Sequence, residues 1–396
     1  MSRPLEGIRV LEMGQLLAGP FAGSVLGYFG AEVIKVEPPG GDPIRGWRVV
    51  RDGTSLWWAS LGRNKKSVTL DLSTERGRAL AKSLAGKCDV LIENFRPGTL
   101  EKWGMAPEAL KALNPRLIVA RVSGYGQTGP YAARPGFASV CEAFAGFRYV
   151  NGFPDRPPVR PNLSIGDTLA GLHAVIGVLL ALTARLRERA AAGQVVDVAI
   201  YESVFNLLEA VVPEYDGAGV VREPSGSTIT GIVPTNTYPC ADGRYIVIGG
   251  NGDSIYQRLM RAIGRPEMAE DPRFATNAKR VESEKEIDAA ILAWTGTLDS
   301  GAALEVLRRA EVPNGPIYSV ADMMADPHFN ARGMFETVRV AGKPLRIPAI
   351  PPRLGDTPGR TDAPGPALGA HTDEVLEALL GLGAEARAEL RGAGVI

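Results

Sequence analysis

The 396-residue sequence has little cysteine and little histidine, with three of each. Cys88, Cys141 and Cys240 are widely spaced and form no CxxC pair. This pattern argues against a disulfide framework and against a Cys/His zinc site, and it is typical of proteins in a reducing compartment. We therefore expect a cytoplasmic protein without a bound metal.

The sequence also lacks net charge and long hydrophobic runs. Its 44 basic and 44 acidic residues cancel, so the charge balance indicates neither a nucleic-acid nor an acidic-membrane partner. The N-terminal MSRPLEGIRVLEMG has no apolar stretch of the kind found in signal peptides. The longest apolar run, residues 172–182, is about half of the roughly 20 residues that a bilayer span needs, and it predicts a buried helix.

Short apolar runs alternate with helical patterns along the first 125 residues. The runs that predict strands are IRVLEMG, EVIKVEPP, SVTLDLS, DVLIENF and LIVARVSGYG, and QVVDVAIY predicts a later one. Strands that alternate with helices predict βαβ units and a parallel sheet. The predicted fold class is therefore α/β, and in doubly wound sheets ligands bind outside the carboxyl ends of the strands.

The chain is too long for one hydrophobic core, and its composition changes in one place. Residues 216–232 are rich in Gly, Ser, Thr and Pro, which is typical of a linker. The following TYPCADGRYIVIGGNG places an Asp-Gly pair between two strand-like runs, as in a β-hairpin. We expect a boundary near residue 220 and a smaller α+β domain after it.

Asp167 lies in the Gly-Asp-Thr sequence 166–168, at the start of the long apolar helix. An Asp in that place is most often an N-cap. The two roles are not exclusive, because the positive end of a helix keeps a carboxylate ionised, as a nucleophile must be. His173 would point away from the helix start, and we interpret it as a packing residue.

Two further features could bind ligands. Gly249, Gly250 and Gly252 follow the strand-like YIVI and could offer N–H groups to an oxyanion, or form a plain turn. Four basic residues lie beside predicted strand ends: Arg63, Lys65, Lys66 and Arg96. They could hold phosphates or belong to solvated loops. A GxGxxG unit with an acidic partner is missing, so a nicotinamide dehydrogenase is not supported.

Eight segments taken together resemble the class III coenzyme A transferases, the family that includes formyl-CoA:oxalate transferase, carnitine CoA-transferase and the α-methylacyl-CoA racemases. In order they are LEGIRVLEMGQLLAGPFAG, GAEVIKVEPPGGDPIRGW, NKKSVTLDL, ENFRPGTLEKWG, LIVARVSGYGQTGPY, IGDTLAG, the GGNG loop and VPNGPIYSVADMMADPHF. They span nearly the whole chain. The resemblance implies an enzyme that moves CoA from an acyl-CoA to a carboxylic acid.

The resemblance also implies the residues that do the chemistry. Asp167 would attack the thioester and carry the acyl group, and the glycine loop (Gly249, Gly250, Gly252) would shield the intermediates and donate to the oxyanion. The residues implied to contact CoA are Leu16, Ala18, Lys35, Leu70, Asn94, Phe95, Arg96 and Lys102. Coenzyme A, as acyl-CoA, is the implied co-substrate.

The fold implied by the resemblance is a large Rossmann-like domain built from both chain ends, residues 1–220 and 329–396. A small α+β domain, residues 221–328, would lie between them in the sequence. Two such chains would form an interlocked homodimer, which periodicity cannot reveal.

The sequence departs from the family pattern after Gly136. Phe137 and Ala138 stand where racemases have His-Asp and the oxalate-type transferase has Tyr-Glu. Without that His, a racemase lacks one of its two proton-transfer groups, so a racemase-type epimerase is the alternative expectation. We place Phe137 in the substrate site. Arg160, in PPVRPNLSIGD, could bind the distal carboxylate of a diacid, with succinyl-CoA as the expected donor, or only brace the loop.

Overall fold

The computed structural model describes residues 2–188 and 192–396, which divide into two compact units. The first unit comprises Met1–Phe147, Pro161–Glu209 and Asn330–Ile396. The second comprises Arg148–Arg160 and Ala210–Phe329. Each unit has its own hydrophobic core.

A six-stranded sheet in the order β5-β2-β1-β6-β7-β8 forms the centre of the first unit, and every neighbouring pair is parallel. The strands are β1 (Arg9–Glu12), β2 (Glu32–Glu37), β5 (Lys65–Thr69), β6 (Val90–Glu93), β7 (Ile118–Ser123) and β8 (Val195–Ala199). This confirms the predicted parallel sheet and α/β class. The strand order reverses between β1 and β6, so ligands are expected at the carboxyl ends of these two strands.

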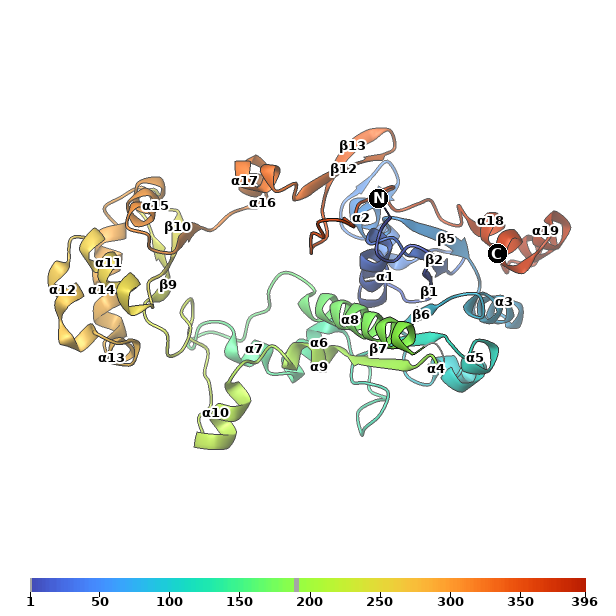
Figure 1. The fold of residues 1–396 in the computed structure, drawn as a ribbon, viewed down its shortest axis with the longest axis horizontal. Coiled ribbons are helices and arrows are strands. Elements are labelled where there is room, and N and C mark those ends of the chain that lie inside the picture. The colour runs from blue at the N-terminus through green and yellow to red at the C-terminus, as the bar shows by residue number, and fades with distance from the viewer. Residues whose placement is uncertain (1, 189–191) are drawn as a thin grey trace. The chain divides into compact units, whose positions relative to one another are not determined.

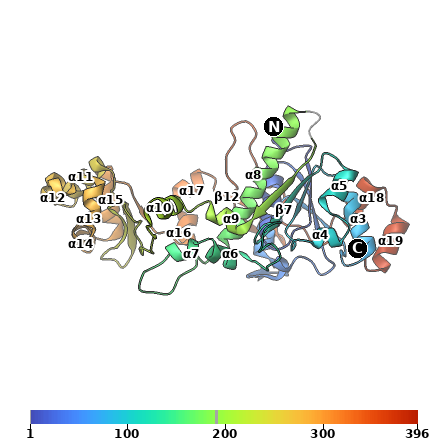
Figure 2. The same cartoon turned by 90° about the horizontal axis from the view of Figure 1, so that it is seen from below.

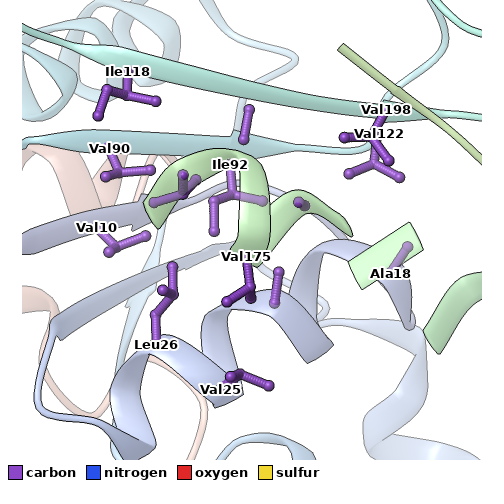
Figure 3. Close-up of a cluster of buried hydrophobic side chains, with 14 of the residues drawn as sticks. Val10, Ala18, Val25, Leu26, Val90, Ile92, Ile118, Val122, Val175 and Val198 are labelled. Atoms are coloured by element: carbon purple, nitrogen blue, oxygen red, sulfur yellow. The ribbon is translucent and has the colours of Figure 1, made fainter. Parts of the chain in front are cut away.

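Helices cover both faces of this sheet, because parallel strands are apolar on both sides (Figure 1). On one face lie α1 (Ala18–Tyr28) and α8 (Ile165–Arg187), which enclose the apolar cluster around Val10, Ile92 and Val175 (Figure 3). On the other lie α3 (Glu75–Ala85), α5 (Pro107–Leu113) and α18 (Thr372–Leu380) (Figure 2).

Glycines let α8 approach its neighbours closely. A Cβ on Gly171 would lie 2.9 Å from the carbonyl oxygen of Ala18 in α1, and one on Gly177 would contact Val196 of β8 at 2.3 Å. With 23 residues α8 is long and apolar enough to span a membrane by length and composition alone. Core helices of soluble proteins meet the same criterion, and the buried face of α8 packs on α1 and the sheet.

The remaining elements of the first unit are shorter. Those that lie between β2 and β7 in the sequence are η1 (Pro43–Gly46), β3 (Val50–Arg51), β4 (Thr54–Ser55), α2 (Leu56–Leu61) and α4 (Thr99–Lys102). Later come α6 (Ala138–Phe144), α9 (Ile200–Phe205), β12 (Phe335–Val340), β13 (Lys343–Pro348) and α19 (Ala384–Gly392), while α7 (Phe147–Val150) starts at the end of the first unit and continues into the second. The C-terminal segment returns to β5, where Thr69 N–H donates to Thr372 Oγ1 at 3.0 Å.

The second unit is built on an antiparallel sheet in the order β11-β10-β9. Its strands are β9 (Thr235–Pro239), β10 (Tyr245–Gly249) and β11 (Asn314–Pro316). The antiparallel pairing of β9 with β10 across Asp242 and Gly243 confirms the predicted hairpin. The helices are α10 (Val211–Ala218), α11 (Asp253–Ala262), α12 (Pro266–Glu270), η2 (Pro272–Phe274), α13 (Asn277–Glu282), α14 (Glu284–Thr295), α15 (Ser300–Arg309), α16 (Val320–Ala325) and α17 (Pro327–Ala331).

The observed division differs from the expected domains of 1–220, 221–328 and 329–396 in two places. The second unit begins at Ala210 and also takes in residues 148–160. That segment contacts the later part of the unit: Tyr149 Oη donates to Glu223 Oε1 at 2.7 Å, and Gly226 N–H donates to the Gly152 carbonyl at 2.8 Å. These contacts join residues about 74 positions apart, which a local composition pattern cannot reveal.

Candidate active site

A cavity of about 130 Å³ lies in the first unit, where the loops after β1, β6 and β7 meet the first turn of α8. It is therefore at the reversal of strand order, where doubly wound sheets bind ligands. Its lining comprises Leu16, Leu17, Ala18, Asn94, Phe95, Arg96, Pro97, Val122, Ser123, Gly124, Arg134, Pro135, Gly136, Phe137, Asp167 and Ile200.

The loop after β1 is held in an uncommon conformation. Leu16 has φ of 64°, a region that non-glycine residues rarely occupy, and its N–H donates to the Asp42 carboxylate at 3.2 Å. Asn94 holds the preceding residue from both sides: its Oδ1 accepts from Gln15 N–H at 2.7 Å and its Nδ2 donates to the Gln15 carbonyl at 2.8 Å. A Cβ on Gly14 would lie 2.8 Å from Asn94 Oδ1, so this approach requires glycine.

A buried charge cluster lies beneath this loop. Lys35 Nζ lies 3.2 Å from Glu12 and 2.9 Å from Asp42, and Lys65 Nζ lies 2.8 Å from Glu12. All four side chains have an exposed fraction of 0%. Burial by itself would lower the pKa of Lys35, but the neighbouring carboxylates, Glu12 first, outweigh it and the pKa is raised. The cluster therefore holds the Asp42 carboxylate beneath the loop, where it accepts the N–H of Leu16.

Three of the four basic residues predicted beside strand ends do not lie in a solvated loop. Lys65 is fully buried and ion-paired, and Arg63, 3% exposed, donates to the carbonyls of Ser60 and Pro348, both at 2.7 Å. Lys66 is half-buried and pairs with Glu32 at 2.9 Å. These three side chains are thus occupied by partners within the protein, and Arg96 is the member of the group that lines the cavity.

Asp167 is the third residue of α8, and Ser164 rather than Asp167 is the N-cap residue. Asp167 is half-buried, lines the cavity and lies in the first turn, where the positive helix end stabilises a carboxylate. The preceding Gly166 donates its N–H to the buried Glu142 of α6 at 3.1 Å. A Cβ on Gly166 would lie 3.0 Å from Ile200 and 3.3 Å from both Ala138 and Glu142. Tight packing thus fixes the turn that carries Asp167.

The thiol of Cys141 in α6 is not a competing nucleophile. Burial, with a smaller effect from the negative charge of Asp167, raises the pKa of Cys141 to about 11. Its Sγ donates to the Gly124 carbonyl at 3.3 Å, and the side chain is fully buried. A thiol with this pKa stays protonated at neutral pH, so Asp167 is the better nucleophile of the two.

The cavity brings together most of the predicted site residues of the first unit. Those that line it are Leu16, Ala18, Asn94, Phe95, Arg96, Phe137 and Asp167. Lys35 and Leu70 are fully buried, the first in the charge cluster and the second in the apolar core, so their side chains face the protein interior. Lys102 is exposed at the end of α4, outside the residues that line the cavity.

The glycine loop and Arg160 belong to the second unit. Gly249 N–H donates to the Pro313 carbonyl at 2.9 Å, and Gly250 N–H donates to the Pro234 carbonyl at 2.8 Å. Both bonds hold the loop to its own unit, so donation from this loop to an oxyanion would come from the residues after Gly250. Gly252 is the N-cap residue of α11.

Two polar residues of the cavity were missed at the sequence level. Ser123 ends β7; its Oγ is buried and has no hydrogen-bond partner in the part of the chain that the structure describes. Arg134 stacks on Tyr131, with its guanidinium carbon 3.5 Å from the ring centroid. Both lie in or just after LIVARVSGYGQTGPY. The position of Ser123 at the end of a predicted strand was a usable signal, whereas Arg134 lies further along the chain in a loop.

Comparison with known proteins identifies the family of the chain. A family model described as CoA-transferase family III matches residues 5–372. Succinyl-CoA–D-citramalate CoA-transferase of Chloroflexus aurantiacus is 50% identical over 397 residues, covering 100% of this chain and 98% of the relative. Succinate–glutarate CoA-transferase of Agrobacterium fabrum is 36% identical, covering 95% and 96%. The crystal structure of a CAIB/BAIF family protein from Brucella suis matches with a TM-score of 0.84 at 36% identity, covering 96% and 100%.

An α/β fold with this cavity and these relatives defines an enzyme of acyl-CoA metabolism. The chain belongs to CoA-transferase family III. It is a class III CoA-transferase that takes an acyl-CoA as co-substrate, which confirms the resemblance described from the eight sequence segments.

Proposed function

We propose that the enzyme transfers CoA from succinyl-CoA to a small dicarboxylic acid through covalent intermediates on Asp167. The proposal rests on the position of Asp167. Among the residues described as lining the cavity, Asp167 is the one with a carboxylate side chain. Relatives named for succinyl-CoA with citramalate, and for succinate with glutarate, support the substrate class.

In the proposed reaction, a carboxylate oxygen of Asp167 attacks the thioester carbonyl and expels CoA thiolate, which leaves a mixed anhydride. The thiolate then attacks the Asp167 carbonyl, releases the donor acid and forms an aspartyl-CoA thioester. The acceptor carboxylate attacks this thioester and again expels the thiolate. Attack of the thiolate on the acceptor's acyl carbonyl gives the new acyl-CoA and restores Asp167. Each step exchanges one activated acyl group for another, so no ATP is consumed.

The cavity suggests roles for its other residues. We propose that Leu16, Ala18, Asn94, Phe95 and Arg96 hold the CoA arm, with Arg96 providing positive charge for its phosphates. Lys102 would contact the nucleotide end and Phe137 the acid. The glycine loop would protect the anhydride from water and stabilise its oxyanion.

We also propose that two chains form a homodimer, interlocked as the resemblance implies. The outer face of α8 supports a protein partner, because Leu172, Ile176 and Leu180 are 40%, 51% and 66% exposed. A soluble protein rarely leaves such an apolar face in water. Sedimentation equilibrium should give twice the 42.0 kDa chain mass at micromolar concentration; a monomer mass would contradict the proposal.

Replacement of Asp167 tests the reaction. Asp167→Asn keeps the shape of the side chain but removes the nucleophile, and we expect kcat to fall by roughly 10⁴-fold or more. Asp167→Ala guards against recovery by deamidation, and Asp216→Asn, an exposed residue of α10, serves as the matched control. Incubation of the wild type with succinyl-CoA should add the mass of CoA to the peptide containing Asp167. Full transfer activity in both Asp167 variants would exclude the covalent route.

A further inference from the structure

Arg134 lies in the same cavity as Asp167. Its guanidinium stacks on the Tyr131 ring at 3.5 Å, and the side chain is exposed. No carboxylate of the described residues lies within ion-pairing distance of Arg134. Stacking holds the guanidinium plane against the ring and leaves its N–H edges available for a ligand in that plane.

The acid substrates of this enzyme present a second charge that must be accommodated. One carboxylate of a diacid reacts at Asp167, and the other stays ionised throughout the reaction. Taking it out of water without a partner is costly, whereas the fork of an arginine can bind it through two charge-assisted hydrogen bonds. A cation in the same cavity as the nucleophile meets this requirement.

Two kinds of anionic group could reach Arg134, namely the unreacted carboxylate of the acid and the phosphates of CoA. In a diacid of four or five carbons, the second carboxyl carbon is only about three or four bonds from the reacting one. The phosphates of CoA are separated from the thioester sulfur by more than about ten bonds. Arg96 lines the same cavity, so the phosphate-free donor in the test below decides whether the acid or a CoA phosphate is the partner of Arg134.

We propose that Arg134 binds the unreacted carboxylate and is the residue that selects dicarboxylic over monocarboxylic acids. This inference rests on the proposed function and names the substrate class of the same site. The sequence-based candidate for this role, Arg160, belongs to the second unit, and the test below distinguishes the two arginines.

The test compares two acids of equal length that differ in the second carboxylate. Isotope exchange of free succinate into succinyl-CoA, and of butyrate into butyryl-CoA, each needs a single acid and reports the transfer chemistry directly. In Arg134→Gln, we expect kcat/KM for the succinate exchange to fall roughly 10- to 100-fold, the range for one charge-assisted pair. The butyrate exchange should stay within about twofold. Arg134→Lys, which keeps the charge but not the fork, should give an intermediate loss.

Other outcomes would overturn the assignment. An equal loss for both acids, together with normal exchange of succinyl-pantetheine, would mean that Arg134 binds a CoA phosphate. A selective loss in Arg160→Gln but not in Arg134→Gln would return the role to Arg160. Arg273→Gln is the control, because Arg273 also lies over an aromatic ring, 4.7 Å from Phe274, on the second unit.

The proposed function and this inference fail in different ways. If the wild type exchanges no acid with its CoA ester, the transferase route through Asp167 is wrong. If the wild type exchanges a diacid other than succinate, that diacid and its monocarboxylic counterpart replace the pair in the assay. A wild type that exchanges butyrate as well as it does any diacid contradicts the selection assigned to Arg134.

Discussion

Gly166→Ala should reduce turnover far more than it reduces stability. The new Cβ would lie 3.0 Å from Ile200 and 3.3 Å from Ala138 and Glu142, so the first turn of α8 must move by a few tenths of an ångström. Overpacking costs about 1–3 kcal/mol, and replacing a helical glycine by alanine returns about 1 kcal/mol, which leaves about 0–2 kcal/mol of net destabilisation. A misplacement of about 1 Å costs roughly 100-fold in rate, so a shift of a few tenths should lower kcat about tenfold.

The assay is steady-state transfer from succinyl-CoA, with urea unfolding on the same preparations. KM for the acyl-CoA should change little, because the loops after β1 and β6 are untouched. Gly301→Ala is the control: Gly301 lies in α15 with open space around its Cβ position, so this variant should be equally active and up to about 1 kcal/mol more stable. Unchanged kcat in Gly166→Ala would refute the argument that packing of this turn places Asp167.

Two further predictions concern the loops that form the cavity. Asn94→Leu removes both hydrogen bonds to Gln15, which should lower the free energy of unfolding by about 2 kcal/mol and raise KM for acyl-CoA. Titration calorimetry with CoA measures the loss of affinity, and an unchanged affinity would contradict this prediction. Burial raises the pKa of Glu93 to about 7, although its ion-pair partner Arg121, 2.8 Å away, acts to lower that pKa. The folded protein therefore keeps a proton that the unfolded chain loses above about pH 4.5. The contribution of Glu93 to stability should therefore fall as the pH rises from about 4.5 to 7 and stay constant above that range. Urea unfolding at pH 5 to 8 should show this trend as a changing difference between wild type and Glu93→Gln, and a constant difference would contradict it.

The parallel sheet could be predicted from the sequence because its strands are short, apolar and separated by helical patterns. The same reasoning placed the ligand site at the carboxyl ends of the strands, where the cavity lies. Local pattern also predicted the β9–β10 hairpin, since the Asp-Gly turn lies within the segment that folds. In these cases the information is contained in neighbouring residues.

The roles of the charged residues could not be predicted in this way. Lys35 and Lys65 lie in strands β2 and β5, and their partner Glu12 lies in β1, so the cluster exists only after three strands have aligned. The location of residues 148–160 in the second unit depends in the same way on distant contacts. Arg134 was overlooked because an exposed arginine in a loop has no distinguishing pattern until its cavity is known.

The cluster of Glu12, Lys35, Asp42 and Lys65 constrains how this enzyme can be altered. Removing one partner of a buried ion pair costs about 3–5 kcal/mol, whereas exchanging the whole set for apolar residues of similar volume can be neutral. Asp42 also holds Leu16 at the cavity, so even a stable apolar replacement would release that loop. A mutagenesis library that varies these four positions one at a time would therefore return mostly unfolded proteins. Joint variation, with an acceptor retained at position 42, is the route by which the loop could be reshaped for other acyl-CoA substrates.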